Sequence, residues 1–200
     1  MNNDTGSFLA RYGRQLLNQG YPIVPISPGS KRPGYKDWQH TRADEAQLNR
    51  WLRNGYAEGG VGVLTRNYPA VDLDVSNAEI VAQLIEWCRS NIAPTLQRVG
   101  MPPRTLLAYR TAEPFRKVSS KIYEDATGKE HKVEILGDGQ QYVAYAIHPD
   151  LHRPYVWTTR CGLADLKPDQ LPIITLEQAQ RLVRYFESIV PFDWKVVTPK

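Results

Sequence analysis

The amino-acid sequence predicts an α/β (α+β) fold organised around a mixed sheet. In the first half of the chain, amphipathic helices alternate with short apolar strands, and in the second half strands follow one another through short turns. Of the 200 residues, 42% are hydrophobic and 23% are charged, which is the composition of an ordinary globular protein. That composition excludes a fibrous, collagen-like or wholly disordered chain.

The first two elements expected are a helix and an edge strand. Residues 7–18 carry apolar side chains at helical spacing, and Gly20 suits the position just beyond the end of that helix. Residues 21–26 form a short apolar run that contains Pro22 and Pro25. Because proline cannot donate a hydrogen bond to a neighbouring strand, we expect this strand at the edge of a sheet.

Two helices and two strands are expected next. Residues 41–53 have helical periodicity, and Thr41 is placed to cap that helix. The apolar segments 61–65 and 70–75 predict two strands. Ser76 opens an S-x-x-E capping box, which predicts that the following helix begins there.

Strands dominate the rest of the chain. The segments DATGK and GDG between them are typical of hairpin connections. A last helix over residues 175–188 has T-x-x-Q capping chemistry at Thr175. The expected strands cover residues 105–110, 121–123, 132–136, 141–147 and 155–157.

Several features indicate a cytoplasmic protein. No apolar run approaches the roughly 20 residues that a membrane span needs, so we expect no membrane partner. The segment MNNDTGSF lacks the basic and apolar regions of a signal peptide. Cys88 and Cys161 are too few and too far apart for a Cys/His zinc motif.

The chain is mildly basic, with 25 Lys and Arg against 21 Asp and Glu. Residues 98–132 hold eight basic and four acidic side chains, so this segment carries the whole net charge of +4. A basic balance of this size is a weak indication of a polyanionic partner.

Two carboxylates share one face of an expected strand. Alternation along the strand sends Val71 and Leu73 into a core and leaves Asp72 and Asp74 on the opposite face, about 7 Å apart at their Cα atoms. Adjacent carboxylates repel each other unless a cation lies between them. Such oxygen ligands suit Mg²⁺ or Mn²⁺. The alternative is a strand with a solvated acidic face.

A third carboxylate lies on a distant strand. Val133 and Ile135 take the core face, which leaves Glu134 on the other face. If the two strands are neighbours, Glu134 completes the ligand set that a two-metal phosphoryl-transfer site requires. The alternative is a cross-strand ion pair between Glu134 and a lysine.

A basic strip separates the two acidic segments. Arg110, Arg116 and Lys117 lie between them in the sequence. Opposite a metal, such groups would neutralise a triphosphate and stabilise charge in a transition state. A solvated basic face is the alternative.

Histidines and one loop lysine provide further candidates. His148 ends an expected strand and can hydrogen-bond a phosphate or sugar hydroxyl, or serve only as a turn residue beside a proline. Trp157 can stack on a base or pack in the core. His131 and His152 are expected at the surface. Lys31, in an expected loop, is a further candidate for contact with a phosphate.

The order of these segments resembles the primase-polymerase (prim-pol) domain found at the N-terminus of replication proteins of phages, plasmids and other mobile elements. That domain belongs to the archaeo-eukaryotic primase superfamily. The matching segments are YPIVPISPGSKRPGYKDW, GGVGVLTRNYPAVDLDV and VEILGDGQQYVAYAIHPDLHRPYVW, which together span about residues 19–158. The resemblance implies a single domain over residues 1–200, with an RRM-like catalytic unit beside a second α/β unit.

The resemblance also implies residue roles. Asp72 and Asp74 match the first acidic motif of the family and Glu134 matches its last; together these motifs bind catalytic divalent metals. His148 matches a histidine ahead of a Y-x-W segment. Many relatives carry another histidine between the acidic motifs, whereas the corresponding region here, LLAYRTAEPFRKVSS, has none. The basic strip is then expected to bind the nucleotide phosphates, or nucleotide affinity is reduced.

The leading hypothesis is a nucleotidyltransferase. It would synthesise primers on a single-stranded DNA template from NTP or dNTP and extend them, with Mg²⁺ or Mn²⁺ bound by the three carboxylates. A single-stranded DNA or nucleotide-binding module with weak catalysis and a metal-dependent nuclease are the alternatives. The chain has no P-loop motif, so a partner helicase would lie outside these residues or on another protein.

Overall fold

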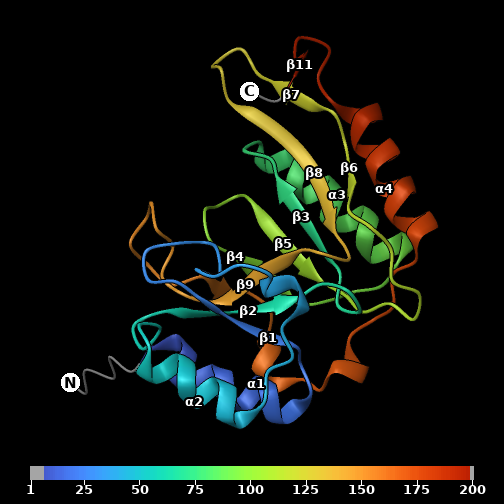
Figure 1. Ribbon diagram of the computed structural model, residues 1–200. Coiled ribbons are helices and arrows are strands. Elements are labelled where there is room, and N and C mark those ends of the chain that lie inside the picture. Colours follow the sequence, from blue (N-terminus) through green and yellow to red (C-terminus); the bar gives the residue numbers. More distant parts are fainter. Residues whose placement is uncertain (1–6, 199–200) are drawn as a thin grey trace.

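The fold consists of two antiparallel sheets, each covered by helices on its outer side (Figure 1). A computed structural model describes residues 7–198, so most of the segment on which the expected lack of a signal peptide rests lies outside the described residues. The smaller sheet has the order β1-β2-β9, with β1 at Ile23–Ile26, β2 at Gly60–Leu64 and β9 at Gln141–Tyr145.

The larger sheet has the order β10-β4-β5-β3-β8-β7-β11, and β6 also pairs with β8. At its centre, β3 lies between β5 and β8. These strands are β3 (Ala70–Asp74), β4 (Gln97–Val99), β5 (Thr105–Ala108), β6 (Val118–Ser119), β7 (Ile122–Glu124), β8 (Glu130–Leu136), β10 (Val156–Trp157) and β11 (Lys195–Val197).

Helices cover the outer sides of both sheets. In Figure 1, α1 and α2 lie below the smaller sheet, and α3 and α4 lie along one face of the larger one. No helix within residues 7–198 is long and apolar enough to span a membrane. The helices are a π-helical turn at Leu9–Gly13, α1 (Arg14–Gln19), α2 (Glu45–Arg53), α3 (Ala78–Asn91) and α4 (Leu176–Ile189), with 3-10 turns at Trp38–His40, Leu163–Asp165 and Pro168–Gln170.

Alternation along the central strands gives the larger sheet one apolar face. The odd-numbered residues of β3 and β8 point toward α3 and α4, where they pack against Leu84 and Phe186. The even-numbered residues therefore face the opposite side, toward the smaller sheet. The buried odd-numbered residues are Val71, Leu73, Val133 and Ile135.

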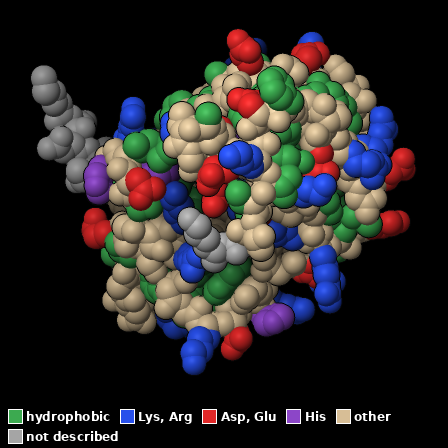
Figure 2. Space-filling model, turned by 90° about the horizontal axis from the view of Figure 1, so that it is seen from above, with side chains coloured by type: hydrophobic (Ala, Val, Ile, Leu, Met, Phe, Trp, Pro, Cys, Tyr) green, Lys and Arg blue, Asp and Glu red, His purple; other side chains and the backbone are tan. Residues whose placement is uncertain are grey.

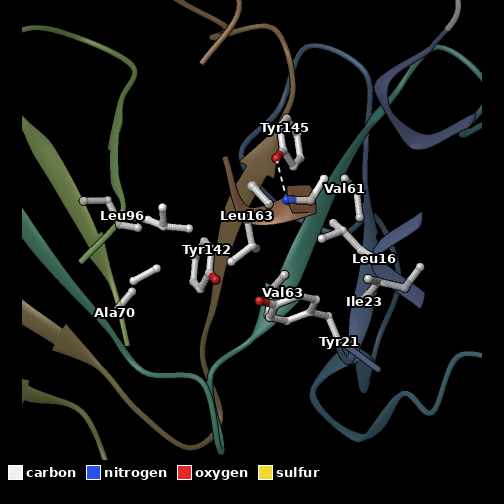
Figure 3. Packing of buried hydrophobic residues seen from close by; sticks show 14 of the residues in the cluster. Leu16, Tyr21, Ile23, Val61, Val63, Ala70, Leu96, Tyr142, Tyr145 and Leu163 are labelled. Carbon is white, nitrogen blue, oxygen red and sulfur yellow. Dashed lines mark hydrogen bonds between the residues drawn. The ribbon is translucent and has the colours of Figure 1, made fainter. Parts of the chain in front are cut away.

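A second core joins the two sheets. Tyr142 and Val63 of the smaller sheet belong to the same buried cluster as Ala70 of β3 (Figure 3). Tyr145 adds a polar anchor, because its hydroxyl accepts a 2.8 Å hydrogen bond from the backbone N–H of Ala164. The shared core fixes the smaller sheet against one end of the larger sheet.

The predicted α/β class is confirmed, with two differences in strand pairing. Every ladder between strands in the described part of the chain is antiparallel, and parallel pairing is confined to two isolated bridges, Arg110 with Ile173 and Arg116 with Asp138. The expected hairpin at GDG is wrong: the segment carries the chain from β8 to β9, which pairs with β2 in the other sheet. By contrast, the DATGK hairpin joins β7 to β8, as predicted.

The first two elements follow their local sequence signals. Gly20 ends α1 with φ of 98°, a left-handed conformation that glycine adopts without steric cost. β1 is an edge strand despite its full burial, in agreement with its prolines. The expected cap at Thr41 is wrong, because α2 is capped by Asp44, whose carboxylate accepts from the N–H of Gln47 at 2.6 Å.

Of the caps predicted for the two long helices, the one of α4 is confirmed and the one of α3 is wrong. Thr175 and Gln178 form the reciprocal box expected at the start of α4. The box expected at Ser76 is wrong, because Asn77 caps α3 by accepting hydrogen bonds from the N–H groups of Glu79 and Ile80. Since Asx and Ser both favour capping, adjacent candidates cannot be separated by residue type alone.

The two adjacent candidate caps can be tested against each other. Replacing Asn77 with Ala leaves two N–H groups of α3 without their acceptor and is expected to lower the free energy of unfolding by about 1 kcal/mol. Ser76→Ala is expected to cost less. Urea denaturation of both variants measures the difference, and a larger loss for Ser76→Ala would contradict the assigned cap.

Candidate active site

The strand register brings the predicted carboxylates together. β3 and β8 pair directly, with Asp72 opposite Glu134 and Asp74 opposite Lys132. Opposite residues in an antiparallel pair point to the same face, with Cβ atoms about 5 Å apart. Asp72, Asp74 and Glu134 therefore share the face of the sheet that is turned toward β9.

The same cross-strand row contains a buried arginine. Leu106 on β5 lies opposite Asp72 on one side and opposite Arg98 of β4 on the other. At about 4.8 Å per strand, Arg98 and Asp72 are separated by roughly 10 Å at the backbone. The long side chain of Arg98 can bridge part of the distance across β5 to Asp72.

These residues line a cavity of about 460 Å³ between the two sheets. Its polar walls come from β3, β4 and β8 of the larger sheet, from β9 of the smaller one, and from the loop after β1. On the surface in Figure 2, basic and acidic side chains are interspersed. The charged side chains of the cavity are Lys31, Arg32, Asp72, Asp74, Arg98, Arg104, Lys132, Glu134 and Asp150.

Glu134 is the most fully compensated carboxylate. Its Oε1 is 2.6 Å from the ammonium of Lys117 and 3.1 Å from that of Lys132, and it accepts a hydrogen bond from Ser119 at 3.2 Å. Burial opposes ionisation of Glu134, but the two ammonium groups outweigh it and lower its pKa. The expected alternative of a cross-strand ion pair is thus also present.

Asp74 and Asp72 differ in their surroundings. Asp74 forms a 2.8 Å ion pair with Arg104. For Asp72, burial raises the pKa to about 6, with Arg98 opposing the rise and the neighbouring carboxylates of Asp74 and Glu134 adding to it. The row thus contains one carboxylate whose ionised form is disfavoured by its site.

The donor chemistry fits a divalent cation. Asp72 and Glu134 offer carboxylate oxygens from adjacent strands, which are the ligands that Mg²⁺ and Mn²⁺ prefer, and a cation beside Asp72 would offset its burial. Within residues 7–198, however, no three His, Cys, Asp or Glu side chains are gathered as a ready metal-ligand set. The carboxylates of Asp74 and Glu134 are instead turned toward their basic partners.

Arg98 is a functional candidate that sequence reasoning did not single out. Its side chain is buried, its guanidinium lies 4.4 Å from the ring centre of Tyr155, and Nη1 donates to the carbonyl of Val143. Its Nε is buried without a hydrogen-bond partner among the described residues. Arg98 thus lines the cavity with one of its guanidinium donors left without a partner.

His148 lines the same cavity. Its Nδ1 accepts a hydrogen bond from the N–H of Asp150 at 3.2 Å, so the neutral ring carries its proton on Nε2. Burial lowers the pKa of His148, and nearby Lys31 adds to this effect. The ring is therefore a neutral donor at pH 7.

The three residues of the predicted basic strip lie in different places. Arg110 follows the C-terminal end of β5, which points away from Asp72. Its Nε donates a 2.7 Å hydrogen bond to the carbonyl of Leu171. Arg116 is exposed and bridges to Asp138 through its backbone. Neither lines the cavity, and of the strip only Lys117 contacts a predicted carboxylate.

Two other positions considered from the sequence are Lys31 and His131. Lys31 lines the cavity and forms a 3.3 Å ion pair with Asp150. His131 is wrongly placed by the sequence at the surface: it is 1% exposed, stacked on Trp194, with Nδ1 accepting from Ser76 N–H. Nothing local could show this, because Trp194 belongs to a distant segment.

The sequence over most of the chain matches a known protein family. Residues 14–173 match the profile of the Prim-Pol family, described as "Bifunctional DNA primase/polymerase, N-terminal". The chain belongs to that family. The primase-polymerase resemblance seen in the sequence is thereby confirmed, and at the level of the family it implies nucleotidyltransferase-type activity on DNA and nucleotides, with a general dependence on metal. A search of curated proteins found no match.

The unusual site of Asp72 has a consequence for stability. The pKa of about 6 exceeds the ordinary value of 3.8, so the native state retains the Asp72 proton more strongly than the unfolded chain. The native state therefore loses stability as pH rises from about 4 to about 6. In chelator-treated protein, Asp72→Asn is expected to raise the melting temperature by a few degrees at pH 7 and hardly at all at pH 4.

The control for this experiment is Asp138→Asn. Asp138 forms a largely exposed ion pair with Arg66, which contributes little to stability, so this variant is expected to gain nothing. Melting curves from pH 4 to pH 7 provide the measurement. An Asp72→Asn gain that is the same at both ends of the range would show that burial of the charge is not its cause.

Proposed function

We propose that this protein is a DNA primase and polymerase that synthesises primers on single-stranded DNA from NTP or dNTP and extends them. The observation that carries the proposal is the pairing of Asp72 with Glu134 on the wall of a cavity that also contains buried Arg98. Membership of the Prim-Pol family supports the same reaction class.

In the proposed reaction, the 3′-hydroxyl of the primer loses its proton to solvent and its oxygen forms a bond to the α-phosphorus of the incoming nucleotide. The bond between the α-phosphorus and the oxygen that bridges to the β-phosphate breaks, and pyrophosphate leaves. Mg²⁺ or Mn²⁺, when bound, would supply Lewis acidity to the attacking and leaving oxygens. Asp72, Asp74 and Glu134 would hold the cation. Their common face and fixed cross-strand spacing would orient the reacting groups.

The phosphates of the nucleotide require positive charge and hydrogen-bond donors. We assign these roles to Arg98 and Arg104 ahead of the basic strip first considered, because both line the cavity. His148 Nε2–H is available to a phosphate or sugar hydroxyl, and Lys31 lies at the same cavity wall. Lys117 remains a candidate through its contact with Glu134, whereas Arg110 and Arg116 would act only if the bound template extends to their positions.

The remaining parts of the proposal concern context. We propose a single primase-polymerase domain over residues 1–200, acting in the cytoplasm with a replicative helicase that lies outside these residues. The core that the two sheets share supports the single domain. The net charge of +4 favours association with a nucleic-acid strand.

Primer synthesis on single-stranded DNA provides the test. Labelled products are expected with Mg²⁺ or Mn²⁺, and Asp72→Ala or Glu134→Gln is expected to reduce their formation by at least about a hundredfold. Glu130→Gln is the matched control, since Glu130 is an exposed carboxylate on the same strand. Undiminished synthesis by Asp72→Ala would refute the mechanism.

The ion pairs at the site favour one other function, a binding module with weak catalysis. Glu134 and Asp74 already form ion pairs with lysine and arginine side chains of the same chain. A binding module would bind single-stranded DNA with strong salt dependence and without a divalent metal. Calorimetric titration with dATP separates the two functions, because metal-dependent binding is expected only of the enzyme. Degradation of DNA without nucleotides would instead indicate a nuclease.

A further inference from the structure

Glu134, the carboxylate proposed above to hold a metal ion, has two lysines as partners. Two lysines contact the same oxygen, Oε1, which leaves that oxygen with its charge balanced before any metal binds. The two lysines reach it from different places: Lys132 is on the same strand and lines the cavity, while Lys117 comes from the segment before β6. A divalent cation that binds Glu134 must therefore do so in the presence of two ammonium groups or displace one of them.

The surroundings of Lys117 suit a side chain that moves. It precedes a strand of only two residues, β6, and its side chain is 38% exposed, whereas that of Glu134 is 11% exposed. The exposed ammonium can therefore leave the carboxylate and remain solvated, but the carboxylate cannot follow it into water. Lys132 differs in its backbone, which is fixed in the β3–β8 ladder opposite Asp74, on the same strand as Glu134.

A divalent cation and the Lys117 ammonium would compete for the same oxygen. Glu134 has a single negative charge, which the ammonium groups of Lys117 and Lys132 already share, so a divalent cation that joined both of them at this carboxylate would meet excess positive charge and be repelled. The ion pair would also explain why the described carboxylates are not gathered around a common point. Binding of the metal would therefore expel Lys117 from Glu134.

We propose that Lys117 is an internal counter-cation that occupies the metal site until a divalent ion displaces it, and that the released ammonium then binds the phosphates of the nucleotide. The inference rests on the proposed function, in which Glu134 holds metal beside a nucleotide. It assigns Lys117 two successive partners: the carboxylate in the empty site and a phosphate in the loaded one. The exchange keeps the charge of the site nearly balanced in both states.

The proposal predicts effects of opposite sign in one variant. Lys117→Met removes the competitor, so Mn²⁺ alone is expected to bind about tenfold tighter. With Mn²⁺ saturating, the same variant lacks a phosphate contact, so dATP is expected to bind several-fold more weakly. Lys117→Arg retains the charge and is expected to stay near the wild-type protein in both measurements.

Electron paramagnetic resonance of free Mn²⁺ measures the first affinity, and calorimetric titration of dATP at saturating Mn²⁺ measures the second. Lys121→Met is the control, because Lys121 is an exposed lysine of the same segment and, among the described residues, its ammonium forms no ion pair with Glu134. Circular dichroism checks that each variant is folded; if Lys117→Met is not, Lys117→Gln takes its place.

The possible outcomes separate this inference from the proposed function. Tighter Mn²⁺ binding together with weaker dATP binding supports the exchange, even if primer synthesis is never detected. Unchanged Mn²⁺ affinity in Lys117→Met, a fall in both affinities, or no Mn²⁺ binding by either protein overturns it. Primer synthesis that depends on Asp72 while Mn²⁺ affinity is unchanged would leave the proposed function standing without the exchange.

Discussion

The candidate site depends on one antiparallel ladder, between β3 and β8. Its register puts Asp72 directly opposite Glu134, although 61 residues separate them in the sequence. A shift of one residue would turn Glu134 into the core beneath α3 and α4 and bring Val133 or Ile135 to the cavity. The apolar residues on the other face of the same strands oppose that shift, because they would lose their burial. The packing of the core thus fixes the geometry of the carboxylates.

Charge balance is the second constraint on this face of the sheet. Three carboxylates in adjacent positions would repel one another, and the chain places Arg104, Lys117 and Lys132 within ion-pair distance of two of them. Asp72 has Arg98 as its main opposing charge and sits in a site that disfavours its ionised form. Because the compensation is unequal, the pKa of Asp72 is raised while that of Glu134 is lowered.

The junction of the two sheets gives the site its enclosure. The smaller sheet contributes Tyr142 and Val143 to the cavity, and Val143 also holds Arg98 through its carbonyl. Gly100 leaves room for Tyr155, because a Cβ at this position would clash with the Tyr155 ring. Close packing at this point keeps the Arg98 guanidinium against the Tyr155 ring, on the same sheet of the cavity lining as the carboxylates of β3 and β8.

Local patterns in the sequence determined the α/β class, most of the strands and the outward face of Asp72, Asp74 and Glu134, since period-2 alternation depends only on neighbouring residues. They also identified Gly20 and the Thr175 box. The short strands β4, β6 and β11 were missed, because two or three residues carry too little pattern to stand out.

Only the tertiary structure decided which charged residues meet. Arg98 and Arg110 are both basic residues near β5, yet one lines the cavity and the other binds the Leu171 carbonyl at the far end of the sheet. The pairing register between strands that are distant in the sequence, together with the position of the second sheet, decides which end of a strand lies at the cavity. Charge and spacing along the chain carry no information about either. The sequence alone therefore named the three acids but, of the bases that contact them, singled out only Lys117.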